Sequence, residues 1–193
     1  MDPKVITAIV IIVVAIIIVA AIVFARRKQK SAQLKEHFGP EYDRALQQHG
    51  NNPAKAEAVL AEREARVHKF TIRELPATER ATYADEWAAV QRRFVDDPSM
   101  AVNEADRLVN RLMNARGYPM ADFDQRADDI SVNYPAVVQN YRSACEIVHR
   151  HSSGRASTED LRQAMVYYRS LFDELLGSTT NAADHPTVLK RAS

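Results

Sequence analysis

The sequence is short of cysteine and glycine, and both shortages exclude classes of protein. Cys145 is the only cysteine among 193 residues, so no disulfide can form within one chain. A single thiol suits a reducing cytoplasm, and on an apolar helix face it is most simply a small core residue. None of the five glycines forms a Gly-rich loop behind a strand, and no serine or cysteine stands in a nucleophile elbow. We therefore expect no enzyme activity and no cofactor.

A strong charge of either sign is also missing, since 26 Lys and Arg residues balance 25 Asp and Glu residues. The balance is uneven along the chain. Residues 1–35 hold six basic side chains and one acidic side chain, which leaves 20 basic and 24 acidic ones for the remainder. That remainder is slightly acidic and carries no basic stripe with interleaved aromatics, which argues against nucleic acid as a partner.

What the sequence does contain is one long apolar run, from Val5 to Ala25, behind a flank of four residues. A helix of about 20 uncharged residues crosses the roughly 30 Å hydrocarbon core of a bilayer. Lys4 precedes the run, whereas five basic residues follow it closely. Because positive flanks stay on the cytoplasmic side, the sequence predicts a single-pass inner-membrane protein whose C-terminal part is cytoplasmic.

A secretory signal peptide is the alternative interpretation of residues 5–25. Val19-Ala20-Ala21 and Val23-Phe24-Ala25 both satisfy the small-x-small cleavage pattern. A signal peptide, however, has an apolar region of about 7–15 residues behind a basic start, whereas here the basic residues follow a longer run. Export therefore remains the second possibility, with the helical part secreted.

The basic residues Arg26, Arg27, Lys28 and Lys30 follow the apolar run directly. Near an anionic leaflet each such charge contributes about 1 kcal/mol to membrane attraction. We predict that these four residues contact anionic lipid headgroups at the membrane surface; the simpler interpretation is that they only fix topology. The helix is expected to continue through residues 26–38 and to stop at Gly39.

Residues 39–177 predict a soluble bundle of about five or six helices, because no segment outside the apolar run alternates at period two. Proline after a capping residue marks helix starts at Pro53 and Pro98, Pro135 marks a further helix start, and glycine marks helix ends at 117, 154 and 177. Apolar side chains recur at spacings of three and four, which predicts an all-α domain with Trp87 in its core. Residues 178–193 lack periodicity and are expected to be disordered.

Two groups of residues resemble metal sites, but neither has the ligands or the spacing that a metal ion needs. Asp122, Asp124 and Asp128 resemble the start of a calcium-binding EF-hand loop, but Arg126 and Ala127 stand where a ligand and a glycine are needed. The second group is His149-x-His151 near a helix end, where a two-residue spacing points the rings about 200° apart. The sequence therefore predicts no metal site, and it places Tyr118 to Asn133 in an irregular segment.

The strings EWAAVQRRFVDDP, AVNEADRLV and RQAMVYYRSLFDELL resemble an uncharacterised bacterial family of single-pass membrane-anchored or exported helical proteins. The resemblance covers about residues 34–177. It implies a recurring helical unit, and it transfers no catalytic or binding residue because the family has no assigned activity.

Two functional classes remain open at this point. One is a membrane-tethered interaction or scaffold module that holds a cytoplasmic protein partner at the bilayer. The other is an exported helical domain that binds a small ligand. The side of the membrane on which the domain lies separates them.

Overall fold

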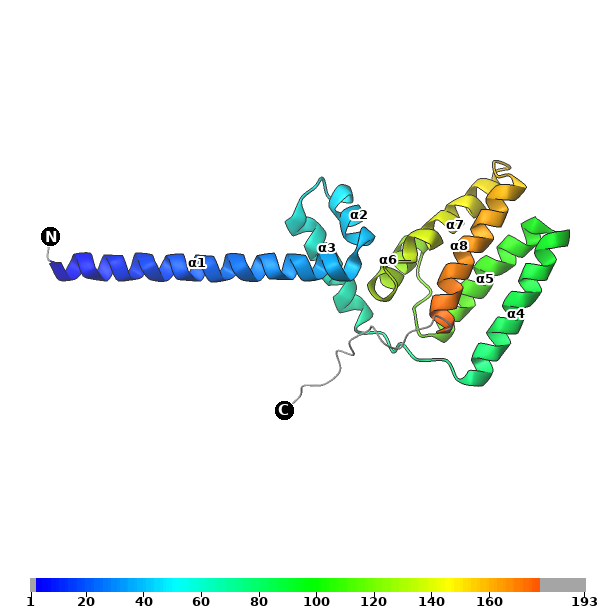
Figure 1. The fold of residues 1–193 in the computed structure, drawn as a ribbon, viewed down its shortest axis with the longest axis horizontal. Coiled ribbons are helices and arrows are strands. Elements are labelled where there is room, and N and C mark those ends of the chain that lie inside the picture. Colours follow the sequence, from blue (N-terminus) through cyan, green and yellow to red (C-terminus); the bar gives the residue numbers. More distant parts are fainter. Residues whose placement is uncertain (1–2, 178–193) are drawn as a thin grey trace. The chain divides into compact units, whose positions relative to one another are not determined.

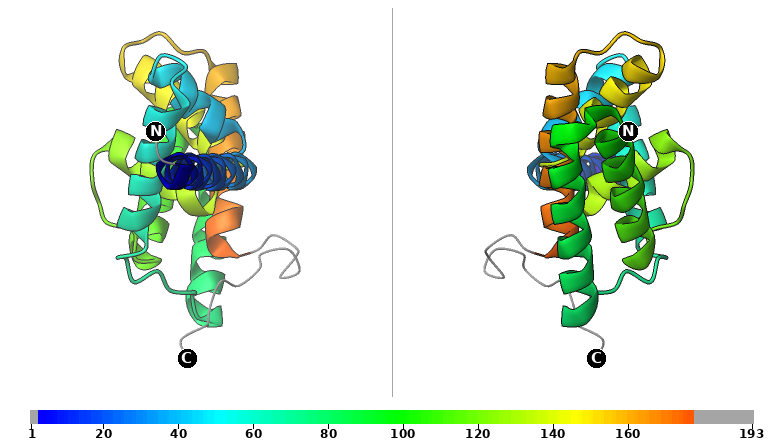
Figure 2. Two further views of the ribbon diagram at one scale, coloured as in Figure 1. Left: turned by 90° about the vertical axis from the view of Figure 1, so that its left-hand side faces the viewer. Right: turned by 90° about the vertical axis from the view of Figure 1, so that its right-hand side faces the viewer.

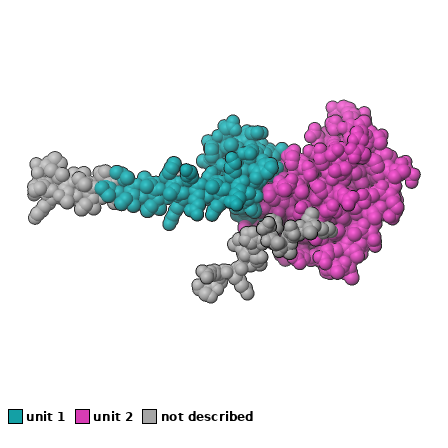
Figure 3. Space-filling model, in the orientation of Figure 1, with its two compact units in different colours: residues 1–67 teal, residues 68–193 magenta. Residues whose placement is uncertain are grey.

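The computed structural model describes residues 3–177, which form eight α-helices and no strand (Figure 1). The all-α prediction is therefore confirmed. The chain divides into two compact units, Met1–Val67 and His68–Ser193, and the division falls inside the segment 39–177 that the sequence predicts as one domain (Figure 3). The predicted disordered tail, residues 178–193, lies outside the described residues.

Unit 1 contains α1 (Pro3–Phe38), α2 (Pro40–Gln48) and α3 (Pro53–Val67). Gly39 has a positive φ of 48° and separates α1 from α2, where the sequence places the end of the first helix. The three helices bury a small apolar core made of Leu34, Phe38, Tyr42, Ala45, Ala56, Leu60 and Val67. The α3 helix thus packs along one narrow stripe.

The α1 helix has two different halves. Leu34 and Phe38 near its end are buried in unit 1, whereas described apolar side chains between Ile12 and Phe24 are exposed. Among the residues that the structure describes, no helix combines the length and the apolar character that a membrane crossing requires.

Unit 2 contains α4 (Ala77–Asp96), α5 (Pro98–Ala115), α6 (Phe123–Asn133), α7 (Val138–Ser152) and α8 (Thr158–Leu176). The α5 helix packs against α4 and α8, α7 packs against α8, and α6 packs against α7 (Figures 1 and 2). Trp87 is buried in this core, as predicted, and its ring stacks on Phe172 with 4.7 Å between the centroids. Large side chains from α4, α5, α7 and α8 therefore meet in one apolar interior.

Local capping chemistry explains where the helices of unit 2 begin and end. Asp97 accepts a hydrogen bond from the backbone N–H of Met100 at the start of α5. Ser157 and Asp160 form a reciprocal capping box at the start of α8, which satisfies N–H groups that the helix leaves unpaired. Gly177 ends α8 in the left-handed conformation that a residue without Cβ adopts most readily.

The structure corrects two sequence predictions. Residues 118–133 are not irregular throughout, because Asp122 caps the helix α6 by accepting from the Gln125 N–H. The second correction concerns α7, which begins at Val138 after a turn and not at Pro135. Its buried stripe is Val138, Tyr141, Ala144 and Ile147, so Cys145 and Val148 lie at the margin of the core.

Gly117 follows α5 with a φ of 96° and lies against the segment that leads into α4. A Cβ atom at this position would come within 2.2 Å of the Thr71 carbonyl oxygen. The adjacent Arg116 carbonyl accepts a hydrogen bond from the Arg73 N–H at 2.9 Å. This close approach therefore requires glycine, for its backbone conformation and for its lack of a side chain.

Candidate functional site

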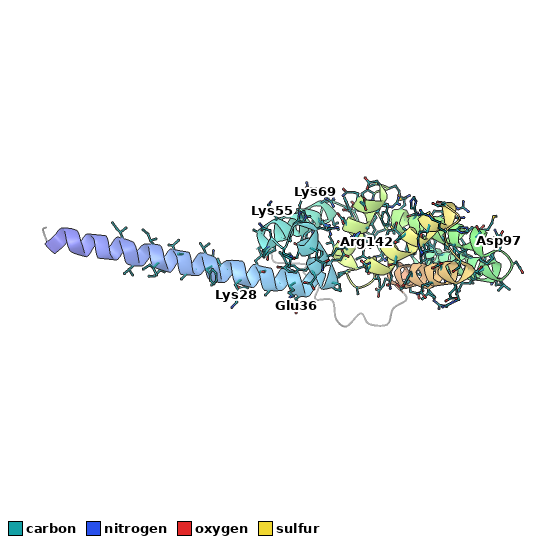
Figure 4. All side chains as sticks on the ribbon, turned by 90° about the horizontal axis from the view of Figure 1, so that it is seen from above. Lys28, Glu36, Lys55, Lys69, Asp97 and Arg142 are labelled. Carbon is teal, nitrogen blue, oxygen red and sulfur yellow. The ribbon has the colours of Figure 1, made fainter. Side chains whose placement is uncertain are left out.

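The predicted membrane-surface residues lie on the part of α1 that leads into unit 1. Arg26, Lys28 and Lys30 are exposed on this helix, and Figure 4 labels Lys28. The side chain of Arg27 lies outside the described residues. Their contact with anionic lipid headgroups stays a prediction.

Two of these basic residues line a pocket of about 580 Å³ between α1 and α3. The α1 helix contributes Phe24, Lys28, Lys30 and Ser31 to its wall. The start of α3 contributes an apolar wall of Pro53, Ala54 and Ala58, together with the carboxylate of Glu57. We call this the α1–α3 pocket; it combines two ammonium groups, a carboxylate and apolar surface.

Hydrogen bonds fix the position of Glu57 in this pocket. Its Oε1 atom accepts from the Ser31 hydroxyl at 2.6 Å and from the Tyr42 hydroxyl at 3.0 Å. All three helices of unit 1 therefore hold this carboxylate. Within the described residues, its other oxygen, Oε2, accepts no hydrogen bond from the protein.

The pocket lies at the end of unit 1 nearest to the apolar half of α1. Glu57 in the second turn of α3 contacts Ser31, whereas Glu64 near the end of α3 lies 3.9 Å from His37. The α3 helix therefore runs in the same direction as α1, and the turn at residues 49–52 brings the start of α3 back beside Phe24 and Lys28.

Unit 2 contains a separate polar cluster that links α5, α7 and α8. The Tyr168 hydroxyl donates to Asp106 Oδ1 at 2.9 Å, and Asn110 Nδ2 donates to Asp106 Oδ2 at 3.1 Å. Tyr141 donates to Asn110 Oδ1 at 3.4 Å, and the Cys145 sulfur lies 3.5 Å from the Tyr168 hydroxyl. We call these five residues the Asp106 cluster.

Burial controls the protonation of the Asp106 cluster. It raises the pKa of the Cys145 thiol to about 11, and it also raises the pKa of Tyr141 and of Tyr168, with the nearby thiol as the next cause for both. The thiolate is the nucleophilic form of cysteine, so little of it is present at neutral pH. The cluster therefore favours a structural role, in which neutral donors satisfy one carboxylate between three helices.

A second hollow, of about 550 Å³, lies between α4 and α5. Two ion pairs, Glu86–Arg111 and Arg93–Glu104, join the two helices across it. Its apolar surface comes from Ala89, Val90 and Leu108. Because each ion pair links the same two helices, charged side chains connect the two walls of this groove.

Three of the five residues weighed as metal ligands, His151, Asp122 and Asp128, have other partners. His151 Nε2 lies 2.6 Å from the Ser99 hydroxyl, a contact between the end of α7 and the start of α5 that the sequence does not suggest. Asp122 caps α6, and Asp128 pairs with Arg142 at 3.2 Å. The part of the chain that the structure describes holds no group of three or more His, Cys, Asp or Glu side chains arranged for a metal ion.

No family model, curated protein or solved structure matches this chain. The resemblance to a bacterial helical family therefore stays a prediction.

Sequence analysis missed Ser31, Tyr42 and Glu57 as parts of a site. Each is an ordinary polar residue on its own helix, and they meet only because α2 and α3 fold back along α1. The sequence signal at this end of unit 1 is the cluster of basic residues at 26–30.

Proposed function

We propose that the protein is a single-pass, membrane-anchored helical interaction module whose soluble part faces the cytoplasm. One observation carries the proposal: α1 is a continuous helix that buries Leu34 and Phe38 near its end but exposes the described apolar side chains between Ile12 and Phe24. Phe24, Ile16 and Ile17 are each more than 60% exposed. A run of exposed apolar side chains on one helix indicates a surface that another apolar phase covers.

A bilayer is the phase that fits this segment best. The sequence from Val5 to Ala25 contains no charged residue, and about 20 helical residues match the hydrocarbon thickness. The excess of basic residues after the segment favours a cytoplasmic location for unit 2 and for the part of unit 1 that follows residue 25.

The interaction role is proposed for the soluble helices. Unit 2 has a close-packed interior, and its α4–α5 groove combines apolar surface with charged edges, as protein-binding surfaces often do. Tethering such a module to the membrane would raise the local concentration of its protein partner at the bilayer.

The test uses the full chain in bacterial cells. A reporter active only in the cytoplasm and one active only outside it are each fused after Ser193, and the membranes are washed with alkaline carbonate. We expect cytoplasmic reporter activity and retention of the chain in the membrane pellet. Release by carbonate would refute the anchor, whereas activity of the exterior reporter, or a mature N-terminus near Arg26, would favour the exported alternative.

A further inference from the structure

The α1–α3 pocket combines opposite charges in a way that a purely anionic ligand would not require. Lys28 and Lys30 supply two ammonium groups on α1, and Glu57 supplies one carboxylate on α3. A ligand with only a negative charge would gain from the lysines but would be repelled by Glu57. A ligand that carries one negative and one positive group could pair with the lysines and with Glu57 at the same time.

Hydrogen bonds hold the Glu57 carboxylate in place, and one of its two oxygens can still accept a hydrogen bond from a ligand. The hydroxyls of Ser31 and Tyr42 donate to its Oε1, which leaves Oε2 without a protein donor among the described residues. A carboxylate oxygen positioned in this way accepts a charge-assisted hydrogen bond from an ammonium group without losing its existing partners.

The apolar part of the pocket lies on the side of the predicted membrane segment. Phe24 belongs to that segment and is 72% exposed, and Pro53 and Ala54 lie opposite it at the start of α3. In the proposed topology these groups are at the depth of the lipid glycerol and upper acyl chains, while Lys28 and Lys30 are at headgroup depth. The volume of about 580 Å³ is large enough for one headgroup.

We infer that the α1–α3 pocket binds the headgroup of a phosphatidylethanolamine lipid. Lys28 and Lys30 bind its phosphate, and Glu57 accepts a hydrogen bond from its ammonium group. The inference rests on the proposed membrane anchor and deepens it, because it assigns one lipid class to a built pocket and not to a diffuse basic surface.

The chemistry of the pocket distinguishes three common headgroups. Ethanolamine carries an ammonium group with three N–H donors, whereas the trimethylammonium group of choline has none. A glycerol headgroup shares the phosphate but has no positive charge for Glu57. Phosphatidylethanolamine should therefore be preferred over phosphatidylcholine and over phosphatidylglycerol.

The experiment measures which lipids stay bound to the full-length protein. The chain is inserted into nanodiscs made of equal parts phosphatidylethanolamine, phosphatidylcholine and phosphatidylglycerol, and the lipids retained after release are counted by native mass spectrometry. We expect one phosphatidylethanolamine molecule in excess over the other two lipids. An equal or greater retention of phosphatidylglycerol would overturn the inference, because it would indicate a purely anionic preference.

The Glu57→Gln substitution tests the ammonium contact. Glutamine keeps a side-chain oxygen for Ser31 and Tyr42 but lacks the negative charge, so the preference for ethanolamine over choline should fall by about threefold to tenfold. Glu62→Gln is the matched control, since Glu62 is exposed on the same helix and does not line the pocket. Equal effects of the two substitutions would overturn the role of Glu57.

The phosphate contact is tested by charge-matched pairs of substitutions. Lys28→Gln with Lys30→Gln should abolish the excess of bound lipid. Arg26→Gln with Lys35→Gln removes the same charge from exposed positions outside the pocket and should leave the excess unchanged. If both pairs reduce binding equally, the basic residues act as a diffuse charge and the pocket assignment is wrong.

Failure of this inference can be told from failure of the anchor. Carbonate washing of the same protein in vesicles reports insertion without regard to headgroup. A chain that stays inserted but shows no lipid preference refutes only the pocket, whereas a chain that carbonate releases refutes the proposed function itself.

Discussion

The two compact units surround their buried charges with very different amounts of apolar core. In unit 1, Glu41 and Arg63 form an ion pair at 3.6 Å inside a small core, and each side chain is less than 10% exposed. Unit 2 also buries the charged side chains of Asp129 and Arg142, but it does so beside a much larger apolar core. Dehydrating a charged pair is costly, so unit 1 should depend mainly on charge matching, whereas unit 2 should depend mainly on the volume of its side chains.

The largest expected effect tests the dependence of unit 2 on volume. Trp87→Ala should lower the free energy of unfolding by about 3–5 kcal/mol, because it leaves a cavity beside Phe172 and loses apolar burial. Thermal unfolding followed by circular dichroism gives the measurement. Val95→Ala is the control, since Val95 lies on the same helix and is 83% exposed. Equal stability of the two variants would show that Trp87 does not support the core.

The dependence of unit 1 on charge matching is tested at Arg63. Arg63→Met should destabilise unit 1 by about 3–5 kcal/mol, because it removes one member of a buried ion pair. Hydrogen exchange of residues 40–67 in the full chain measures the loss. Adding Glu41→Leu should restore most of the protection, since two apolar side chains can replace a buried pair. If the amides of residues 40–67 exchanged as fast in the double variant as in Arg63→Met, the proposed charge matching would be wrong.

A smaller effect is expected at the Asp106 cluster. Tyr168→Phe removes a hydroxyl that donates to a carboxylate at 2.9 Å, which should cost about 1.5–3 kcal/mol. Chemical denaturation of the full chain gives the value. Tyr167→Phe changes the neighbouring residue by the same atom and should cost less, because no hydrogen bond of the Tyr167 hydroxyl is found among the described residues. Equal costs would mean that the Asp106 contact contributes little.

The smallest effect is a dependence of stability on alkaline pH. Burial raises the pKa of the Cys145 thiol from 9.0 to about 11, so the unfolded chain releases this proton at lower pH than the folded chain does. Stability should therefore be constant below about pH 8 and should decline toward pH 11, by about 1.4 kcal/mol at pH 10. The Cys145→Ser variant should lack this part of the decline. Identical profiles for the two proteins would mean that the thiol is not shielded from water.

The sequence predicts most of the helices because local signals mark their ends. Pro40, Pro53 and Pro98 stand at helix starts, and Gly177 ends α8 in the left-handed conformation. The stripe of α8 from Leu161 to Leu175 is buried as its spacing indicates. These features depend on residues close together in the chain, which is why sequence alone identifies them.

The features that sequence analysis missed depend on contacts between distant residues. The acidic run at 122–129 is typical of a loop, yet Ala127 and Ile130 form enough of an apolar face to pack α6 into unit 2. Glu57 belongs to a pocket only because the turn after α2 returns the chain to α1. Neither arrangement leaves a periodic pattern in the sequence, so neither could be predicted from spacing.

The continuity of α1 has a mechanical consequence. A helix advances about 1.5 Å and turns about 100° with every residue, so an unbroken helix transmits rotation as well as length. If residues 5–25 are held in a bilayer as proposed, one residue inserted between Ala25 and Leu34 would raise α2 and α3 by about 1.5 Å and rotate them around the helix axis by about 100°. The direction in which α2 and α3 face would then be set by the number of residues in this short stretch.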